Sequence, residues 1–549
     1  MRYSLPILGF LFLGLLASNT FATIRHVNVQ SLSPTPPYTN WTTAAKAIQD
    51  AVDAAEPGDE VLVSDGIYQT GGSSVLETDP PTTNRVSVTK PITVRSLNGP
   101  DVTTIQGYQH PETTNGESAV RCVYLGSGAA LIGFTLTQGA TRTNQNGGGV
   151  YCESSGSLVS DCVLIANSAS STGGGAYQGT LQSCRLLTNS AHFGGGASAA
   201  TSREDTCILK SCLLRGNSAT SGSGANWATL TDCTISENSG SAIRSGVLTD
   251  CIISGNHDEW AGGGSDGGLF VRCNITGNSA LYGGGSSGGE FIYCTLAGNS
   301  ALQGGGAYGA TLDRCLVIGN EGSGVESCLV RNSLIVSNTS YDGAAIGSWL
   351  LNCTVTGNFG FNIGGASASE LQNCILHGNT GSAADNYETS CTLFYCCTAP
   401  LPVDAGNSNN IASTPLFVDA LRGDFHLRTN SGCINSGTNR ILINGMPDFT
   451  EDLDGNPRIS GSTIDMGAFE YQFPPITPPR LQVARFGNNL MLSWPIDATG
   501  FVLERTSSLT PITSWTSITE GIKTSGGTYV YTTAIEGDSA FFRLRANSP

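Results

Sequence analysis

Charged residues are scarce in this sequence, and basic ones scarcest. Only 13% of the 549 residues are charged, and 26 Lys and Arg stand against 43 Asp and Glu, for a formal net charge of −17. No stripe of basic side chains is available to neutralise phosphates, which excludes nucleic acid as a partner. The negative charge also disfavours anionic polysaccharides unless a cation bridges them to the protein.

Long hydrophobic runs are absent beyond the first 22 residues, MRYSLPILGFLFLGLLASNTFA. That stretch has one Arg, an apolar core and the ending Thr20-Phe21-Ala22, which is the layout of a cleavable secretory signal. No later run is long enough to span a bilayer. We therefore expect a chain that is secreted or exported to the outer cell surface, without a transmembrane segment after cleavage.

Glycine is abundant, with 71 residues, and the chain is too long for one compact core, which favours an elongated repeat architecture. A unit of 18 to 22 residues, once 28, recurs around an anchor position. Three residues before the anchor stands an aliphatic residue or Phe, two after it an aliphatic residue, and five after it always Asn, from Asn167 to Asn379. The anchor residues are Cys162, Cys184, Cys212, Cys233, Cys251, Cys273, Cys294, Cys315, Ser333, Cys353 and Cys374.

The Cys-x-aliphatic step has the period of a β-strand, so the Cys and the aliphatic residue face the same side. Each unit accommodates about three short strands, and stacking the units in parallel pairs their backbones from rung to rung. The pattern predicts a β-solenoid. Because Asn tolerates a left-handed backbone and stacked amides bond to one another, the Asn column predicts an asparagine ladder at a sharp corner.

The chain has 18 cysteines, and export would permit disulfides. Ladder cysteines on in-register rungs are farther apart than the Cβ separation of about 3.8 Å in a relaxed disulfide, so we expect them to be reduced and buried as small hydrophobes. No His singles one of them out for nucleophilic activation. The remaining disulfide candidates are Cys391, Cys396, Cys397 and Cys433.

The repeat array is flanked by segments of different character. An N-terminal cap over 23–110 contains an apolar helical stripe (Ala44, Ala47, Ile48, Ala51, Val52 and Ala55), a usual cover for the open edge of a first rung. We assign residues 1–22 to the signal peptide and 23–471 to the solenoid, with regular rungs over 150–380. A closing segment over 391–471 precedes a Pro-rich linker over 472–480 and a small all-β module over 481–549.

Several motifs resemble a known family. The stretch "GDEVLVSDGIY" is similar to the N-terminal cap of right-handed parallel β-helix proteins of the pectin-lyase-like superfamily, and the Asn and Gly-Gly-Gly-Ala rungs are similar to repeats of bacterial secreted β-helix proteins and, more loosely, of polymorphic outer-membrane proteins. "TPLFVDALRGDFHLRTNSGCINSGTN" with "DLDGNPRISGSTIDMGAFEY" resembles the choice-of-anchor Q segment that closes many such helices. The resemblance implies an all-β fold, a right-handed parallel β-helix with an N-terminal helix cap, followed here by a small β-sandwich-like module. It implies little about chemistry, because the superfamily includes lyases, hydrolases and proteins with no known activity.

One column suggests catalysis. Asp232, Asp250 and Arg272 stand directly before the anchor Cys on three successive rungs, which places two carboxylates and a guanidinium in line on the outer surface. The resemblance implies a role for such residues, because pectate-lyase-like enzymes hold calcium with carboxylates and remove a proton with Arg. The alternative is an exposed charge ladder neutralised by its own Arg.

Exposed aromatic residues in the corners after the Asn column suggest glycan binding. Flat rings beside carboxylates can stack on sugars and hydrogen-bond to them, although the same residues can simply cover the solenoid wall. The candidate residues are Phe193, His257, Asp258, Glu259, Trp260 and Tyr282.

A fragment near the C-terminal end of the solenoid is similar to part of a calcium loop. Asp452, Asp454 and Asn456 have the spacing of calcium ligands, but the distal bidentate Glu is missing, and the resembled family carries a similar turn. We expect a turn and no cofactor; calcium would enter only with the lyase alternative. The sequence thus favours an exported or cell-surface scaffold that contacts a polysaccharide without evident catalysis. The alternative is a polysaccharide lyase or glycoside hydrolase acting on a uronate-containing polysaccharide.

Overall fold

A computed structural model describes residues 22–75, 81–200, 206–403, 406–441, 450–473, 479–498, 500–509, 515–535 and 539–546. The chain divides into two compact units: unit 1 contains Met1–Arg458 with Asp465–Glu470, and unit 2 contains Ile459–Ile464 with Tyr471–Pro549. The expected signal peptide, apart from Ala22, and residues 474–478 of the expected linker lie outside the described residues. In the described ranges, no helix combines the length and the hydrophobicity needed to cross a membrane.

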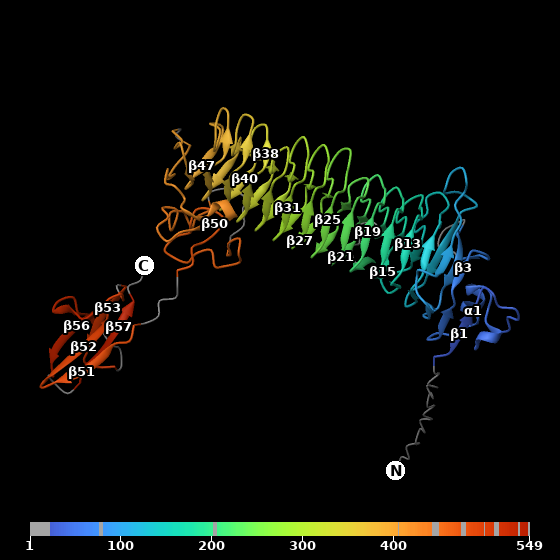
Figure 1. Ribbon diagram of the computed structural model, residues 1–549, viewed down its shortest axis with the longest axis horizontal. Helices are drawn as coiled ribbons and strands as arrows, with labels where there is room; N and C mark the ends of the chain where they lie inside the picture. Colours follow the sequence, from blue (N-terminus) through green and yellow to red (C-terminus); the bar gives the residue numbers. More distant parts are fainter. Residues whose placement is uncertain are drawn as a thin grey trace, which may run out of the picture. The chain divides into compact units, whose positions relative to one another are not determined.

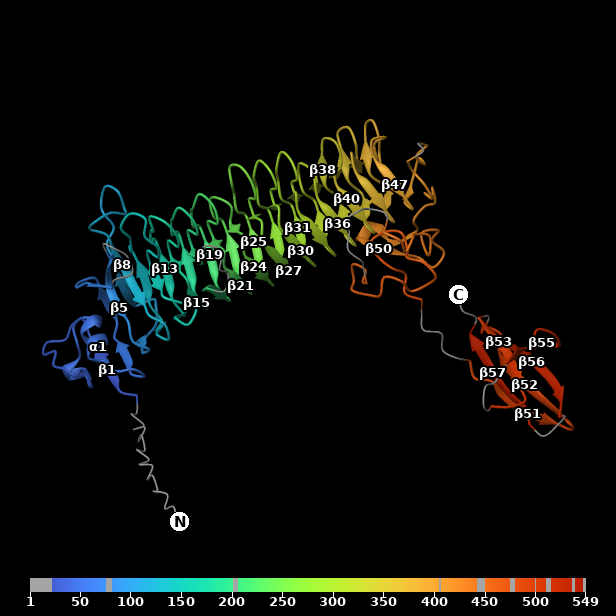
Figure 2. The ribbon, with the colours of Figure 1, turned by 180° about the vertical axis from the view of Figure 1, so that it is seen from behind.

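Unit 1 is a parallel β-solenoid with three long sheets, and each regular rung gives one short strand to each sheet (Figures 1 and 2). Sheet A has 16 strands: β1 (Ile24–Val27), β2 (Glu60–Val63), β6 (Thr93–Ser96), β9 (Ala130–Ile132), β12 (Leu158–Ser160), β15 (Gly179–Gln182), β18 (Cys207–Lys210), β21 (Thr229–Thr231), β24 (Val247–Thr249), β27 (Leu269–Val271), β30 (Glu290–Ile292), β33 (Thr311–Asp313), β36 (Leu329–Arg331), β40 (Trp349–Leu351), β44 (Glu370–Gln372) and β47 (Thr392–Phe394). Sheet B has 15 strands: β3 (Gly66–Tyr68), β7 (Thr103–Gln106), β10 (Thr135–Thr137), β13 (Val163–Ile165), β16 (Arg185–Leu187), β19 (Leu213–Arg215), β22 (Thr234–Ser236), β25 (Ile252–Ser254), β28 (Asn274–Thr276), β31 (Thr295–Ala297), β34 (Leu316–Ile318), β37 (Leu334–Val336), β41 (Thr354–Thr356), β45 (Ile375–His377) and β48 (Cys397–Thr398). Sheet C has 14 strands: β4 (Ser73–Ser74), β5 (Thr83–Val88), β8 (Val120–Leu125), β11 (Val150–Cys152), β14 (Ala176–Tyr177), β17 (Ala197–Ser198), β20 (Ala225–Asn226), β23 (Ile243–Arg244), β26 (Ser265–Asp266), β29 (Ser286–Ser287), β32 (Ala307–Tyr308), β35 (Val325–Glu326), β39 (Ala345–Ile346) and β43 (Ala366–Ser367).

The strand register matches the columns of the sequence repeat. In sheet A, Leu181 pairs with Val159 on one side and with Leu209 on the other. In sheet B, Leu186 pairs in the same way with Leu164. All of these side chains are fully buried in the continuous core of the solenoid. The predicted β-solenoid, with these two columns facing inward, is confirmed.

Left-handed residues form the corners between the sheets. The residue before the anchor Cys has a positive φ along the array, as in Asp250 (φ 55°) and Tyr293 (φ 55°), and so does the residue before the Asn, as in Gly277 (φ 62°). The expectation that the Asn itself takes the left-handed conformation is therefore wrong by one position. The left-handed residue before each Asn faces outward. The Asn that follows it therefore points its side chain into the core.

The asparagine ladder is confirmed as a chain of buried hydrogen bonds. Asn278 donates its side-chain Nδ2 and its backbone N to Oδ1 of Asn299, each at 3.0 Å, and Nδ2 also donates to the carbonyl of Ile253 at 3.0 Å. One rung earlier, Asn256 donates to Oδ1 of Asn278 at 2.9 Å. The same pattern runs from Asn167 to Asn379, and all of these amides are buried.

The anchor thiols form a second chain of contacts. The Sγ of Cys294 donates to the carbonyl of Ile292, two residues back, at 3.4 Å and accepts the backbone N–H of Cys273 at 3.4 Å. Ser333, the one exception in the column, does the same: its Oγ donates to Arg331 at 2.6 Å and accepts the N–H of Cys315 at 3.0 Å. The ladder cysteines therefore serve as weak hydrogen-bonding groups at a corner as well as small hydrophobes, which explains why Ser replaces Cys.

All 18 cysteines lie in described segments, and each is buried. Burial of the ladder cysteines is thus confirmed. The assignment of Cys396 and Cys391 outside the repeat is wrong: Sγ of Cys396 accepts the N–H of Cys374 at 3.4 Å, as the next anchor residue would, and Cys391 stands five residues before Cys396, as Ser369 does before Cys374. The repeat continues for one rung beyond Cys374, and the sequence motif hides this rung because Thr398 replaces the aliphatic residue.

A helix covers the N-terminal end of the solenoid, as expected, but it is shorter than the predicted apolar stripe from Ala44 to Ala55. Helix α1 spans Ile48–Ala54, so Ala44, Ala47 and Ala55 flank it instead of extending it. Its residues Ile48, Ala51 and Val52 are buried and join the core of the solenoid. A 3-10 turn, η1 (Trp41–Thr43), precedes it.

The closing segment covers the side of the solenoid as well as its end. Residues 406–411 extend the last rung, because Ser408 pairs with Phe394 and Ile411 with Cys397. Residues 414–441, 450–458 and 465–470, which we call the lateral segment, lie along the outer face of sheet B, beside the strands coloured yellow (Figures 1 and 2). The segment contains β49 (Phe417–Asp419), the 3-10 turn η3 (Ala420–Arg422) and β50 (Asp424–Leu427).

The lateral segment is held by apolar contacts with outward-facing residues of sheet B. Leu334 and Val336 pack against Phe425, Ala468 and Phe469, and each of these five side chains is buried. These contacts explain why the outer positions of β37 are apolar although the interior of the solenoid is already filled.

A three-stranded sheet on the solenoid contains β38 (Thr339–Ser340), β42 (Phe359–Gly360) and β46 (Thr380–Gly381). Unit 2 contains two antiparallel sheets whose core includes Leu492, Trp494 and Leu503, which confirms the small β-sandwich-like module. Its strands are β51 (Gln482–Phe486), β52 (Asn489–Pro495), β53 (Phe501–Thr506), β54 (Thr516–Ser517), β55 (Ile522–Ser525), β56 (Thr528–Ala534) and β57 (Phe541–Ala546).

Candidate functional site

The acidic column predicted as an alternative catalytic site lies at the corner between sheets A and B. Asp232, Asp250 and Arg272 have φ values of 53°, 55° and 52°, so their side chains turn outward from successive rungs. Arg272 binds Asp250 through two hydrogen bonds of 2.7 Å. This contact lowers the pKa of Asp250 and raises that of Arg272, so the guanidinium stays protonated and is not poised to act as a base. The geometry matches the alternative that the sequence left open, a neutralised charge ladder.

The residues predicted to bind glycan are spread over several rungs. Trp260 is 71% exposed, whereas Tyr282 on the next rung is half-buried. Tyr282 pairs with Ala261, one residue beyond Trp260, and its ring lies 5.7 Å from that of Tyr308. Within the described ranges, Trp260 makes no contact with another aromatic ring. The two residues thus lie on adjacent rungs, but the structure does not join their rings into one surface.

The polar candidates beside Trp260 are largely committed to the loop. Asp258 accepts hydrogen bonds from the backbone N–H groups of Trp260, Ala261 and Ser241 at 2.7 to 2.8 Å. The side chain of Asp258 therefore fixes a turn, as Asp often does in loops. His257 Nδ1 lies 2.9 Å from the Oγ of Ser279.

The two remaining candidates differ in exposure. Glu259 is exposed, and Phe193 contacts the ring of His192 at 4.2 Å and the guanidinium of Arg244 at 5.1 Å. Of these two residues, Phe193 is therefore already packed on one face by its own chain.

A cluster of aromatic residues that the sequence analysis missed lies on the three-stranded sheet. Tyr341 and Phe361 stack with ring centroids 6.5 Å apart and planes inclined by 28°, and Phe359 meets Phe361 edge to face at 5.3 Å. The three side chains are 70%, 62% and 44% exposed, in the order Tyr341, Phe361 and Phe359. We call these three residues the aromatic platform.

The sequence did carry a signal for this platform. On most rungs the ladder Asn is followed by Ser, but Thr339, Phe359 and Thr380 take that position on the three rungs of the extra sheet. Backbone pairing aligns Phe359 with Thr339 and with Thr380, and Tyr341 and Phe361 directly follow β38 and β42. This pairing brings Tyr341 and Phe361 to equivalent positions on adjacent rungs.

Hydrogen-bonding groups border the aromatic platform. Asn362 Nδ2 donates to Oδ1 of Asp342 at 2.8 Å, and both residues directly follow a platform residue. On the next rung, Oδ1 of Asp385 accepts the N–H of Gly381 at 3.1 Å, and Asp385 is exposed. The platform therefore combines flat apolar rings with carboxylate and amide groups, as carbohydrate sites often do.

A cavity of about 490 Å³ lies between the lateral segment and the solenoid. Gly357, which lines it, stands two residues before Phe359 and so belongs to a rung that also carries the platform. Its walls include Val336, Thr356 and His377 of sheet B and Phe417, Leu421 and Arg428 of the lateral segment. Burial lowers the pKa of His377, so this side chain is neutral at pH 7.

The lateral segment is also tied to the solenoid by ionic contacts. Glu451 accepts a hydrogen bond from the hydroxyl of Tyr293 at 3.2 Å and forms an ion pair with Arg314. Arg314 in turn binds the buried carboxylate of Asp313 at 2.8 Å, and Arg331 binds the same carboxylate at 3.1 Å. Arg314 occupies the same corner column as Arg272, so this column serves as a docking edge near the lateral segment.

The candidate calcium residues form a turn. Oδ1 of Asp452 accepts the N–H groups of Asp454 and Asn456 at 3.0 and 2.8 Å, and Oδ2 accepts that of Glu470 at 3.0 Å. Asp454 instead binds Nε2 of His426 at 2.7 Å. In the described part of the chain, no group of three or more His, Cys, Asp or Glu is arranged to hold a metal ion. The oxygens of Asp452 are thus used to fold the loop.

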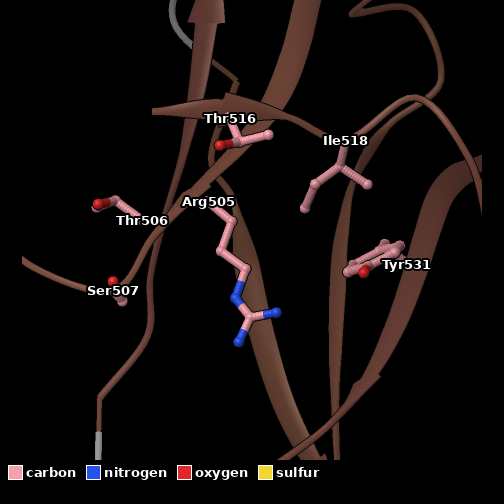
Figure 3. Close-up of a pocket in the computed structure, with 6 residues that line it drawn as sticks. All are labelled: Arg505, Thr506, Ser507, Thr516, Ile518 and Tyr531. Carbon is pink, nitrogen blue, oxygen red and sulfur yellow. The ribbon is translucent and has the colours of Figure 1, made fainter. Parts of the chain in front are cut away.

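Unit 2 has a cavity of its own, of about 440 Å³ (Figure 3). In Figure 3 the side chain of Arg505 lies between Thr506 and Ser507 on one side and Ile518 and Tyr531 on the other. The guanidinium lies 5.9 Å from the ring of Phe542. The cavity offers a cation and several hydroxyl groups, which fits a small polar ligand better than an apolar one.

Part of the chain is similar to a known family. Residues 221–399 match the family model of the right handed β-helix region, in agreement with the expected right-handed solenoid. No curated protein matches the chain in sequence. Solved structures similar to it include pectate lyase Pel9A, with 16% identity, 82% of this chain and 97% of that chain covered and a TM-score of 0.26.

Two further structures illustrate the range of similar proteins. The A-module of the Azotobacter vinelandii mannuronan C-5 epimerase AlgE6 shows 13% identity, covers 64% of this chain and 94% of its own, and has a TM-score of 0.30. The tailspike protein gp49 of the Acinetobacter baumannii bacteriophage Fri1, a capsular polysaccharide depolymerase, shows 9% identity, covers 96% of this chain and 83% of its own, and has a TM-score of 0.25.

Proposed function

We propose that the protein is an exported or cell-surface β-helix scaffold that binds a neutral polysaccharide through its aromatic platform. The observation that carries the proposal is the grouping of Tyr341, Phe359 and Phe361 on one outer face, with ring contacts of 6.5 and 5.3 Å and all three rings exposed. Exposed apolar groups are usually scattered singly, so a contiguous group of three rings needs an occupant.

The geometry suits a sugar chain. The apolar faces of pyranose rings stack on aromatic side chains, and two rings stacked from rung to rung offer a flat contact surface. Asp342 and Asn362 beside the rings can accept and donate hydrogen bonds to sugar hydroxyls. The cavity that begins at Gly357 provides room for a substituent or for the end of the chain.

Charge supports a neutral ligand. The protein has a net charge of −17, and Asp342 and Asp385 stand at the platform itself. A polyuronate would bring a further negative charge to these carboxylates and be repelled unless a cation bridged them. A neutral polysaccharide meets no such penalty.

The alternative function, a polysaccharide lyase or glycoside hydrolase acting on uronate residues, rests on Asp232, Asp250 and Arg272. The two hydrogen bonds between Arg272 and Asp250 oppose it, because they hold the guanidinium protonated. We therefore treat the corner column as part of the scaffold.

The test is a glycan array of neutral and uronate-containing oligosaccharides, probed with the full chain from Thr23. Binding to a neutral oligosaccharide is expected, and Tyr341→Ala or Phe361→Ala should weaken it roughly threefold to tenfold, since each stacked ring contributes about 0.5 to 1.5 kcal/mol beyond burial. Trp260→Ala, which removes a similarly exposed ring elsewhere, is the matched control and should leave affinity unchanged. Loss of binding in Trp260→Ala alone would instead locate the site at Trp260.

A second measurement addresses the enzyme alternative. Uronate oligosaccharides are incubated with the protein and calcium, and absorbance of an unsaturated product is followed. No turnover is expected. Turnover that disappears in Asp250→Asn or Arg272→Lys would establish a lyase and contradict the scaffold proposal.

A further inference from the structure

We infer that Cys397 and Cys433 form a disulfide that fastens the lateral segment to the last rung of the solenoid. Cys397 is the first residue of β48, the last strand of sheet B. Cys433 belongs to the lateral segment and follows 36 residues later. Both are fully buried and lie in one apolar cluster with Ile375, Leu427 and Met466. Within that cluster the two thiols interact directly.

Cys397 points away from the anchor ladder. It pairs with Ile375, whose side chain packs outward under the lateral segment, whereas the adjacent Cys396 occupies the inward anchor position. Successive side chains of a strand face opposite sides, so the two neighbouring cysteines belong to different environments. The Sγ of Cys397 contacts the carbonyl of Ser413 at 3.0 Å, in a chain segment that leads into the lateral segment.

Ladder cysteines differ from this pair in geometry. Their side chains come from in-register parallel strands and point the same way, so neighbouring Cβ atoms stay near the rung spacing of about 4.8 Å, beyond the roughly 3.8 Å typical of a disulfide. Each ladder sulfur also donates to the carbonyl two residues back, as Cys374 does to Gln372 at 3.2 Å. Cys397 and Cys433 approach from two different segments and are free of this constraint.

The cross-link is a two-electron oxidation that requires a disulfide-bearing oxidant, such as oxidised glutathione or an oxidoreductase. The thiolate of Cys433 attacks one sulfur of the oxidant, and the other oxidant sulfur leaves as a thiolate. Cys397, deprotonated, then attacks the sulfur of Cys433, the second oxidant sulfur leaves, and the two protons lost by the protein end on the reduced dithiol. Because both residues are buried in the finished fold, the reaction belongs to folding, before the lateral segment docks.

The experiment refolds the full chain in a buffer of reduced and oxidised glutathione, followed by alkylation in denaturant, mass measurement and non-reducing peptide mapping. Of the 18 thiols, 16 should alkylate, since 18 less two leaves 16, and a single linked pair of peptides should contain Cys397 and Cys433. Alkylation of all 18, or a link between ladder cysteines, would overturn the inference.

Two variants separate Cys397 from its neighbour, which falls on the same peptide. Cys396→Ser, which repeats the substitution that Ser333 already makes in the anchor column, should keep the disulfide and 15 alkylatable thiols, because 17 cysteines remain and two are linked. Cys397→Ala should lose the disulfide and alkylate at all 17. A disulfide that disappears in Cys396→Ser and persists in Cys397→Ala would assign the bond to Cys396 and refute the proposed pair.

Discussion

The outer face of sheet B differs sharply between the two halves of the solenoid, although the inner face does not. In the N-terminal half, the outward residues Arg185 and Asn274 are exposed, whereas Leu334 and Ile375 at the same position of later rungs are buried beneath the lateral segment. The inward residues remain apolar throughout, and the Asn ladder runs through both halves. The inward residues of a rung therefore determine the solenoid fold, and its outward residues determine whether another segment packs against that rung.

The largest expected effect tests whether the interior is the same in both halves. Asn278→Leu leaves the backbone N–H and the Nδ2 of Asn256 without their acceptor and removes the Nδ2 that donates to the carbonyl of Ile253, at a cost of about 1 to 3 kcal/mol for each unpaired group. Asn338→Leu, in the half covered by the lateral segment, should lower the free energy of unfolding by a similar amount. Urea unfolding of both variants measures the loss.

The control for this pair is Asn274→Leu, an outward Asn four residues before Asn278, which should change stability by less than about 0.5 kcal/mol. Equal melting temperatures for Asn278→Leu and the wild type would show that the ladder contributes nothing to stability.

A somewhat smaller effect should appear only on the covered face. Leu334→Ala removes a buried side chain from the contact with the lateral segment and should cost about 2 to 4 kcal/mol. Leu213→Ala, at the outward position of an uncovered rung, should cost much less because Leu213 is only half-buried. Thermal unfolding measures both, and limited proteolysis should cut the lateral segment faster in Leu334→Ala alone. Similar losses in the two variants would contradict the distinction between the halves.

The arginines of the corner column also differ between the two halves, in their exposure and in their partners. Arg314 is 17% exposed and joins Asp313 to Glu451, whereas Arg272 is 55% exposed and binds only an exposed Asp250. We expect Arg314→Met to cost about 1 to 3 kcal/mol, because it removes one of the two arginines that bind the buried carboxylate of Asp313 and also the ion pair with Glu451. Arg272→Met should cost less than about 1 kcal/mol. Urea unfolding measures the loss of stability in both variants. A larger loss for Arg272→Met than for Arg314→Met would contradict the structural role given to Arg314.

The smallest effect is a pH dependence confined to the lateral segment. Burial alone lowers the pKa of His426, but hydrogen bonds to Asp454 and Asp424 of 2.7 Å outweigh it, and the pKa is raised. A raised pKa in the folded state means that the pair stabilises the fold fully below the unfolded value of about 6.5 and loses this contribution as the pH rises through the folded value. Melting temperatures from about pH 5 to 9 should show a small decline that His426→Gln lacks. A decline of the same size in the variant would exclude His426 as its source.

The sequence predicted the solenoid well because its rules are local. A period of two within strands and a recurring Asn after each second strand suffice to place Leu181 and Leu209 on one face, and the structure has them there. The same rules missed the rung anchored at Cys396, because Thr398 breaks the aliphatic column. They also placed the left-handed corner at the Asn instead of the residue before it.

The candidate sites were harder to predict, because they depend on contacts between distant segments. Arg272 and Arg314 share a column in the sequence, yet only Arg314 meets Glu451, which is 137 residues away. The Asp452 motif has calcium-like spacing, but its oxygens bind backbone N–H groups in the turn. The aromatic platform was within reach of the sequence, since Phe359 replaces the usual Ser after the ladder Asn.

The asparagine ladder gives the chain a direction. Every ladder Asn donates towards the rung that follows it, as Asn256 does to Asn278 and Asn278 to Asn299. During folding, the newest rung therefore presents amide donors that remain unsatisfied until the next rung forms and supplies its Oδ1. Each completed rung is a template for its successor, so the solenoid can assemble one turn at a time from the N-terminal end.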